Sequence, residues 1–583
     1  YMQYLQIKTS KLNLRNLNNI ITIMAGLSLT FASCTDMDIV PKAQGNSESW
    51  YTTETELQMA VNEFYILGYW ATPLQSSEQW TDNFTYRNTN RCAILDGTMQ
   101  GQQYEVYTLW QQDYKLIARA NTLLESIDRA KDNLAEDKIH QFEGEVYFAR
   151  ACKYAELISY YGDVPYLDKY ITIEESLKLG RKPKAELIPL VYDDFDKAIE
   201  YLPTSYGKEA EHFTKGAAYA MKARFALYMG DWKVAAESAK ACMDLNIYSL
   251  EPDYGKLFLQ STKTNPEKIF VLPRSIANDV IVDSWIVKNS LPRNAGGYGS
   301  CCPSWDLLAA YLCTDGLPID ESSLFNPQEP FKNRDPRCTA TIVEYGTEHC
   351  GFIYDPNPTV MKVMNTTTGV EQANQDNRKV NQYASYNGLI WKKGIDISWT
   401  ENGKEAENDY IIMRYADVLL MYAEAKIELN EIDDTVLEAI NRVRARAYST
   451  DFTNTGSYPS VKDEGQEKLR KIVRLERRVE LANEGLRYMD LIRWKLAEKA
   501  LNRPNYINLQ PDECIEKVVN RGLWPWPETP DIDEDGLADF SKMADDGLIG
   551  IGAQRVFPER QYLWPIPTHD NELCPELGNN PGY

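Results

Sequence analysis

The chain has 583 residues, of which 85 are acidic and 62 basic, so its net charge at pH 7 is −23. A protein this acidic repels phosphate backbones, which excludes nucleic-acid binding through phosphate neutralisation. Its length suffices for a large core, and its 37 tyrosines and 13 tryptophans supply flat apolar faces that keep a polar edge in water.

The first 33 residues predict a lipoprotein signal peptide. Three basic residues and no acidic one precede an apolar run that ends in small residues before Cys34. A cysteine at this cleavage position predicts that Cys34 carries lipid, so that the membrane is an anchor and is not spanned. The alternative of a transmembrane helix is disfavoured because the apolar run is short and Asn19 interrupts it. Residues 34–50 are expected to form a flexible tether.

Residues 51–272 predict an N-terminal helical block. Large apolar side chains recur at helical spacing from Trp110 to Leu124. Gly162, followed closely by Pro165, predicts the end of a helix. Residues 217–229 and 232–244, joined by a Gly-Asp pair and rich in alanine, resemble a tetratricopeptide helix pair. The fold class is therefore predicted to be mainly α, with tetratricopeptide-like helix pairs as the scaffold.

The rest of the chain predicts a loop-rich insertion, a second helical block and an irregular end. Residues 273–405 are rich in proline, glycine and asparagine, and a long insertion of loops on a rigid scaffold usually carries binding. Helices are expected over 410–429, 438–447 and 467–499, within a block at 406–500, with Glu424 and Glu428 on a solvated flank. Residues 501–583 are expected to pack back on the helices, which makes 51–583 one intertwined domain.

Histidine and cysteine positions argue against common metal chemistry. The four histidines are scattered, and no cysteine pair besides Cys34 has the C-x-x-C spacing of zinc or redox sites. An exported chain can hold one or two disulfides. Buried free thiols fit the sequence as well.

Five phrases in order resemble one family, the SusD/RagB-like outer-membrane lipoproteins of Bacteroidetes. The phrases are GEVYFARA at 144–151 with YGDVP at 161–165, RYADVLLMYAEA at 414–425, INRVR at 440–444, ERR at 476–478 with EGLRYMDLIRW at 484–494, and LWPIP at 563–567 with NNPGY at 579–583. Asp36 and Asp38 behind the lipid site likewise resemble the surface-export signal of such lipoproteins.

The resemblance implies a SusD-like α-helical fold on a protein that is anchored in the outer membrane and faces the cell surface. It implies capture of oligosaccharides, delivery to a SusC-like TonB-dependent transporter, and no catalysis. A protein that captures and delivers oligosaccharides requires no cofactor. Within the phrases, Arg414, Glu424, Glu476 and Arg477 are expected to form ion pairs between helices, because buried charges must be paired.

Candidate ligand contacts come from local composition, because sugar recognition needs aromatic faces beside amides, carboxylates or arginines. The richest stretch is 80–88, and the insertion adds three aromatic positions. The predicted contacts are Trp80, Asn83, Tyr86, Arg87, Asn88, Trp285, Tyr298 and Trp399. Glycines on both sides of Tyr298 would let a ligand approach.

One acidic loop has the spacing of a calcium site. Asp531, Asp533 and Asp535 alternate before Gly536, with Asp539 beyond, as in the D-x-D-x-D-G pattern of calcium loops. The twelfth position is Lys542, so the bidentate glutamate of an EF-hand is missing. A structural calcium ion and a plain acidic surface loop both remain open.

Two other functions are compatible with the sequence. A peptide-binding uptake lipoprotein would use the same fold. A surface glycoside hydrolase would need two carboxylates about 5–9.5 Å apart at a cleft, and no phrase of the sequence points to such a pair.

Overall fold

Helices dominate the part of the chain that the computed structural model describes, which is residues 50–70, 77–87, 89, 92–207 and 212–583. This confirms the mainly α prediction. The predicted signal peptide, Cys34 and Asn88 lie outside the described residues. Residues 51–583 form a single unit. Among the described residues, every helix is too short or too polar to cross a membrane.

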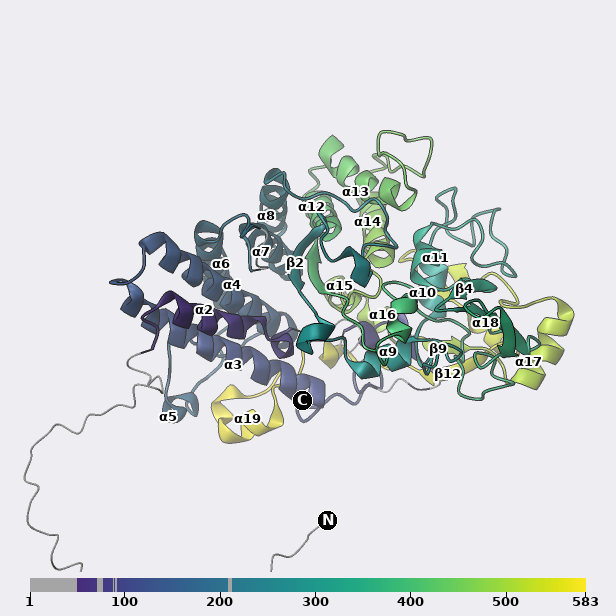
Figure 1. Cartoon of the computed structure of the whole chain (residues 1–583), viewed down its shortest axis with the longest axis horizontal. Helices are drawn as coiled ribbons and strands as arrows, with labels where there is room; N and C mark the ends of the chain where they lie inside the picture. The colour runs from purple at the N-terminus through teal and green to yellow at the C-terminus, as the bar shows by residue number, and fades with distance from the viewer. Residues whose placement is uncertain (1–49, 71–76, 88, 90–91, 208–211) are drawn as a thin grey trace, which may run out of the picture. The chain divides into compact units, whose positions relative to one another are not determined.

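The N-terminal block is a series of antiparallel helices (Figure 1). Its helices are α2 (Glu54–Asn62), α3 (Tyr104–Ser126), α4 (Glu136–Tyr161), α5 (Ile173–Ser176), α6 (Lys184–Tyr201), α7 (Lys215–Met229) and α8 (Trp232–Asp244). Helix α4 packs against both α3 and α6, and α7 packs against α8. Helix α4 ends where the sequence predicts, because Gly162 follows it at φ +75°.

The α7–α8 pair confirms the predicted tetratricopeptide-like hairpin. Gly230 adopts the left-handed conformation (φ +74°) that the tight connection requires. Asp231 then caps α8 by accepting a hydrogen bond from the backbone N–H of Val234. Ala220, Ala223 and other small residues of α7 are fully buried, which lets the helices approach closely.

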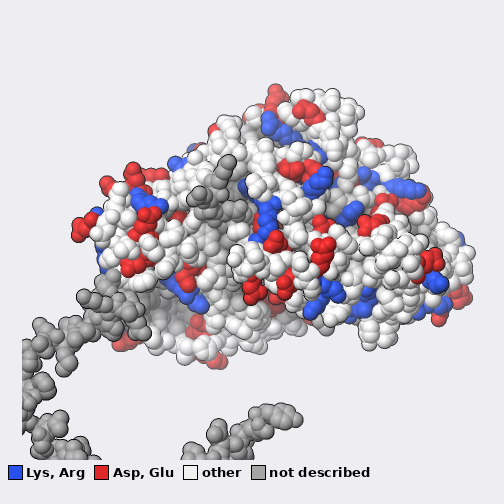
Figure 2. Space-filling view, in the orientation of Figure 1, with Lys and Arg blue, Asp and Glu red and all other residues white. Residues whose placement is uncertain are grey.

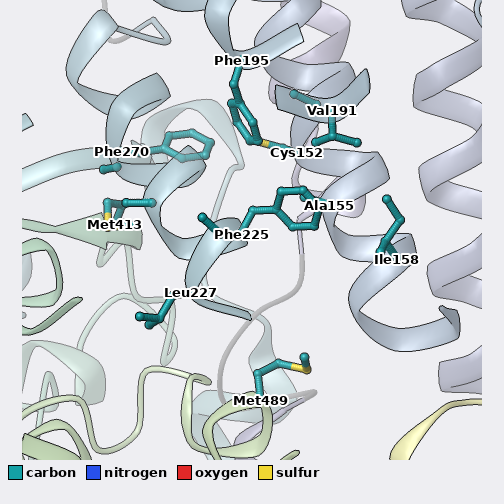
Figure 3. Packing of buried hydrophobic residues seen from close by; sticks show 14 of the residues in the cluster. Cys152, Ala155, Ile158, Val191, Phe195, Phe225, Leu227, Phe270, Met413 and Met489 are labelled. Atoms are coloured by element: carbon teal, nitrogen blue, oxygen red, sulfur yellow. The ribbon is translucent and has the colours of Figure 1, made fainter. Parts of the chain in front are cut away.

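The large core of the molecule joins the N-terminal helices to residues from the second half of the chain. Figure 3 shows side chains of α4, α6 and α7 beside Phe270, Met413 and Met489. Phe270 lies in β2 (Lys268–Leu272), which pairs antiparallel with β8 (Tyr410–Arg414). Full burial of each such side chain contributes about 1.5–3 kcal/mol, so the two halves stabilise each other.

The second helical block differs from the prediction at two places. Its helices are α12 (Tyr415–Glu428), α13 (Asp434–Ala447), α14 (Gln466–Glu480), α15 (Arg487–Arg493) and α16 (Ala497–Ala500). Residues 410–414 form strand β8 instead of the first helical turn, because they pair with β2. The single helix predicted over 467–499 is interrupted after Glu480, where Asn483 and Gly485 adopt positive φ.

Residues 273–405 and 501–583 contain short elements separated by loops. The insertion holds α9 (Ser284–Ser290), β3 (Cys301–Pro303), α10 (Trp305–Ala310), α11 (Arg337–Thr341), β4 (Thr347–His349), β5 (Phe352–Tyr354), β6 (Lys362–Asn365) and β7 (Val370–Ala373). The C-terminal part holds β9 (Pro504–Ile507), α17 (Pro511–Lys517), β10 (Asp531–Ile532), β11 (Ala538–Asp539), α18 (Ser541–Asp545), β12 (Gly550–Gln554) and α19 (Thr568–Leu573). Strands β4 to β7 form one antiparallel sheet in sequence order.

The four charged residues of the family phrases are paired, as predicted. Arg414 contacts Glu480 at 2.7 Å, and Arg477 contacts Asp417 at 2.7 Å. Glu424 is buried and receives two hydrogen bonds from the guanidinium of Arg493. The expectation that Glu424 lies on a solvated flank is therefore wrong, because the helix face it occupies is covered by α14 and α15.

Cysteine pairing is decided for the described residues. All ten cysteines there are buried and free, so the free-thiol alternative holds. Burial raises the pKa of the Cys302 thiol to about 11 and that of Cys92 to about 12, which keeps both thiols protonated.

Candidate ligand-binding surface

Two of the stretches predicted to contact a ligand lie next to each other. Residues 84–86 form β1 (Phe84–Tyr86), which pairs antiparallel with β3, so that Tyr86 lies opposite Cys301. Arg87 at the end of β1 is thereby placed beside the loop 293–300 that leads into β3. Its guanidinium donates a hydrogen bond to the carbonyl of Tyr298 at 3.3 Å.

Tyr298 is presented by a tight loop that follows α9. Its N–H donates to the carbonyl of Lys288 at 2.6 Å, which turns the chain back on the helix. Gly297 is required in this turn, because a Cβ there would lie 2.2 Å from the carbonyl oxygen of Leu291. The Tyr298 side chain remains 48 % exposed.

A second tyrosine joins the surface from a loop that the sequence analysis missed. Tyr383 is 53 % exposed, and its carbonyl accepts a hydrogen bond from Nε of Arg293 at 2.8 Å. The guanidiniums of Arg293 and Arg87 each lie 5.8 Å from the centre of the Tyr383 ring. Arg87, Arg293, Tyr298 and Tyr383 are called the aromatic surface below.

Asp376 holds the loop that carries Arg293. Its carboxylate accepts hydrogen bonds from the backbone N–H groups of Arg293 at 2.7 Å and Asn294 at 3.0 Å. Burial raises the pKa of Asp376 to about 6, although these hydrogen bonds oppose the shift. The side chain of Asn294 fixes the other side of the loop by donating to the carbonyl of Ala373.

Trp285 lies on the helix that supports this loop. It is 38 % exposed in the first turn of α9, one turn before the Lys288 carbonyl that holds Tyr298. Trp285 is thus linked to Tyr298 through α9 and the Lys288 carbonyl, and Arg87 is linked to Tyr298 through its guanidinium. Together they offer the aromatic faces and hydrogen-bond donors that a sugar requires.

Four other predicted contacts, Trp80, Asn83, Tyr86 and Trp399, are buried, which corrects the expectation that they face a ligand. Trp80 is 3 % exposed, and the rings of Tyr488 and Trp564 lie 5.3 and 5.2 Å from its own. Asn83 is fully buried between Glu78 and Arg478, which use both ends of its amide. Residues 80–86 are all buried, so their aromatic and polar side chains form part of the core.

Tyr86 and Trp399 also lack an open face. Tyr86 is 8 % exposed, and the guanidinium of Arg87 lies 5.8 Å from its ring centre. Trp399 is 4 % exposed and donates its indole N–H to Asn408 at 2.8 Å. The pocket beside Trp399 has a volume of about 120 Å³, below the roughly 300–1,000 Å³ of typical ligand pockets.

A larger pocket, of about 540 Å³, lies between α14 and the acidic loop at 533–536. Several of its charged residues are already paired, among them Arg444 with Glu476 and Arg487 with Asp82. Volume alone would favour this pocket. The aromatic surface is preferred because it carries exposed rings together with cationic groups that lack such partners.

The acidic loop is neutralised by basic side chains. Asp533 accepts hydrogen bonds from the N–H groups of Asp535 and Leu537, and it contacts Arg503 at 2.6 Å. Lys499 pairs with both Asp533 and Asp535. Within the described ranges, no group of three or more His, Cys, Asp or Glu side chains is arranged so that it could hold a metal ion. The arrangement does not fit calcium.

We expect calcium to release no heat when it is titrated into chelator-treated protein in a calorimeter. The reason is that Lys499 and Arg503 already supply the positive charge that a cation would bring to Asp533 and Asp535. A saturable heat that disappears in the variant Asp533→Asn would contradict this and support the calcium prediction from the sequence.

Two family models match the chain. The model described as "SusD family" matches residues 266–583, and the one described as "Starch-binding associating with outer membrane" matches residues 43–227. SusD-like protein P2 of Formosa agariphila is 27 % identical over 517 residues, covering 83 % of this chain and 92 % of its own. SusD-like protein P25 of the same organism is 26 % identical over 416 residues, 69 % and 72 % of the two chains.

The fold has solved counterparts. A SusD-like carbohydrate-binding protein from Bacteroides fragilis superposes with a TM-score of 0.73 at 26 % identity. The match covers 90 % of this chain and 99 % of that protein. Because the first family model spans more than half of the 583 residues, it identifies the family as well as the fold.

Proposed function

The chain belongs to the SusD family, and we propose that it binds oligosaccharides at the cell surface and delivers them to a SusC-like TonB-dependent transporter. The observation that carries this proposal is the aromatic surface. Two tyrosine rings, each about half exposed, stand beside two guanidiniums on loops held by β3 and Asp376. This combination suits a pyranose, whose C–H face is apolar and whose rim is polar.

The proposal includes a lipid anchor in the outer membrane. Support comes from the sequence around Cys34, which is typical of a lipoprotein processing site. The family model over residues 43–227, described as associating with the outer membrane, is consistent with that location. A tether of about 15 residues would allow travel of tens of ångströms, so the body could cover a transporter without leaving the membrane.

The proposal also includes the absence of catalysis. Asp376, the carboxylate that shapes the aromatic surface, is buried and bonded to backbone amides, so it does not face a ligand. We expect no reducing sugar to be released when the protein is incubated with the polysaccharides it retains. Release of reducing ends would favour the hydrolase alternative instead.

Substituting Tyr298 or Tyr383 by alanine is expected to weaken binding of the retained polysaccharide about tenfold each, because each removes a stacking face. Affinity electrophoresis in polysaccharide gels, followed by calorimetry with oligosaccharides, measures the change. Tyr170→Ala is the matched control, because Tyr170 is 61 % exposed in the N-terminal helical block.

Two outcomes would contradict the proposal. If Tyr170→Ala lowered affinity as much as the site variants, the aromatic surface would not be the binding site. If the wild-type protein retained peptides and no polysaccharide, the peptide-binding alternative would replace the glycan-binding function.

A further inference from the structure

The two arginines of the aromatic surface have no carboxylate partner. Across the described part of the chain, no carboxylate lies within 4 Å of the guanidinium of Arg87 or Arg293. Among the described residues, the guanidinium of Arg87 donates to the carbonyl of Tyr298, and that of Arg293 donates to the carbonyl of Tyr383. In a chain with 85 acidic and 62 basic residues, such a pair is unexpected.

Many other arginines of this protein are paired with carboxylates. Arg150 makes two hydrogen bonds of 2.7 Å to Asp194, and Arg487 makes two, of 2.9 and 2.8 Å, to Asp82. Figure 2 shows acidic and basic side chains interspersed over one face of the molecule. Arg181, Arg334 and Arg378 also bond to carbonyl or amide oxygens instead of carboxylates. Arg87 and Arg293 differ from them because their two guanidiniums lie beside the same exposed tyrosine ring.

The two guanidiniums lie close enough to oppose each other. Burial, and then the positive charge of Arg87, lower the pKa of Arg293. The negative charge of Asp376 opposes this shift without reversing it, and the Asp376 oxygens accept from the backbone N–H groups of Arg293 and Asn294 instead of from the Arg293 guanidinium. An anion between the guanidiniums would remove the repulsion.

The backbone also holds Arg87 in a costly conformation. Its φ is +44°, in the left-handed region that residues with a side chain rarely adopt. Its Nε is buried and has no hydrogen-bond partner among the described residues, a feature that Arg334 and Arg378 share. Strained residues with unused donors are typical of positions kept for a ligand.

A third cation lies at the edge of the same loop. The ammonium of Lys404 donates to the carbonyl of Gly296 at 2.6 Å, and it has no carboxylate within 4 Å among the described residues. Gly296 precedes Tyr298 by two residues. Arg87, Arg293 and Lys404 thus lie on or against the loop that carries Tyr298.

We propose that the glycan recognised here is acidic, carrying uronate carboxylates or sulfate esters that bind between Arg87 and Arg293 while the sugar ring stacks on Tyr298 or Tyr383. The proposal rests on the proposed function, because it names the class of glycan for the same surface. Planar guanidiniums suit both anions, since each can donate two parallel hydrogen bonds to a pair of oxygens.

The test compares matched probes that differ only in charge. One pair is oligogalacturonate and its carboxyl-reduced product, and the other is a sulfated galactan oligosaccharide and its desulfated product. We expect at least one acidic probe to bind the wild-type protein tenfold or more tightly than its neutral partner, and to weaken as NaCl rises from about 50 to 500 mM. The two pairs distinguish carboxylate from sulfate.

The variants Arg87→Gln and Arg293→Gln are each expected to lose about 10- to 100-fold in affinity for the acidic probe. Affinity for its neutral partner should change little. Arg87→Lys keeps the positive charge but lacks the planar guanidinium that donates two parallel hydrogen bonds, so it should recover only part of the lost affinity. Arg129→Gln, in the 3₁₀ turn Ile127–Ala130, is the control for loss of one positive charge elsewhere, and thermal melts check that each variant folds.

Equal binding of acidic and neutral probes, unchanged by Arg87→Gln and Arg293→Gln, would overturn this inference and leave the glycan-binding function standing. An equal loss of affinity for the acidic probe in Arg129→Gln would mean that only the net charge of the protein matters, and this would also overturn the inference. If wild-type protein bound neither probe pair nor any neutral polysaccharide, the proposed function and the inference would both fail.

Discussion

Replacing Glu480 by glutamine is expected to lower the free energy of unfolding by about 3–5 kcal/mol, because it leaves buried arginines without their shared counter-charge. Glu480 is fully buried at the end of α14. It contacts Arg414 at 2.7 Å and Arg337 at 2.9 Å, and it pairs with Arg446. For a chain of this length the loss corresponds to about 3–5 °C in melting temperature, which calorimetry can measure.

The reason for this large effect is the position of Glu480 where three parts of the chain meet. Arg414 ends β8, Arg446 lies in α13, and Arg337 begins α11 in the insertion. The control is Glu438→Gln, which removes an exposed pair with Arg442 and should cost less than about 0.5 kcal/mol. Equal effects of the two substitutions would contradict the prediction.

The effect of Glu480 depends on pH with a defined sign. Although burial alone would raise it, the pKa of Glu480 is lowered by the charges of Arg446, Arg414 and Arg337. A carboxyl whose pKa is lower in the folded state stabilises the fold above its unfolded pKa, and this stabilisation is lost as pH falls through the folded value. The difference between wild type and Glu480→Gln should therefore be constant from pH 6 to 8 and shrink only below about pH 4.

Replacing Trp80 by alanine is expected to cost about 3–5 kcal/mol of stability and to change glycan affinity by less than about twofold. Its ring is enclosed by Tyr160, Tyr488 and Trp564, so truncation leaves a cavity in the core. Denaturant unfolding and affinity electrophoresis on the same preparation separate the two effects.

Trp285→Ala is the matched substitution with the opposite expectation. Trp285 is 38 % exposed on α9, the helix whose Lys288 carbonyl holds Tyr298, so we expect a loss of less than about 1 kcal/mol in stability and a measurable loss of affinity. If Trp80→Ala abolished binding at unchanged stability, the sequence-based view of Trp80 as a ligand contact would be restored.

The helical scaffold could be predicted because its signals are local. Gly230 and Asp231 separate two alanine-rich periodic segments, and the observed helices α7 and α8 end and begin at these residues. The strand at 410–414 could not be predicted, because its conformation depends on pairing with β2, about 140 residues away. Likewise, the burial of Glu424 depends on Arg493, which lies beyond a turn that periodicity does not reveal.

The candidate site was only partly predictable for the same reason. Tyr298 and Trp285 were found because glycines and loop composition surround them. Arg293 and Tyr383 were missed, although Arg293 directly precedes the stretch around Tyr298 that composition singled out. The distance of Arg293 and Arg87 from the Tyr383 ring follows from contacts between segments about 90 and 300 residues apart in sequence.

The sequence by itself determined the helical scaffold, the resemblance to a family of surface lipoproteins and the predicted lipid anchor at Cys34, because all three depend on residues close together in the chain. Only the tertiary structure decided which aromatic and charged residues are open to a ligand. Trp80 and Tyr298 were both predicted from local composition to contact a ligand. The first is enclosed by rings from α4, α15 and the C-terminal segment, and the second is held outward by the end of α9. Burial is a property of packing between distant segments, so periodicity and composition could not distinguish the two.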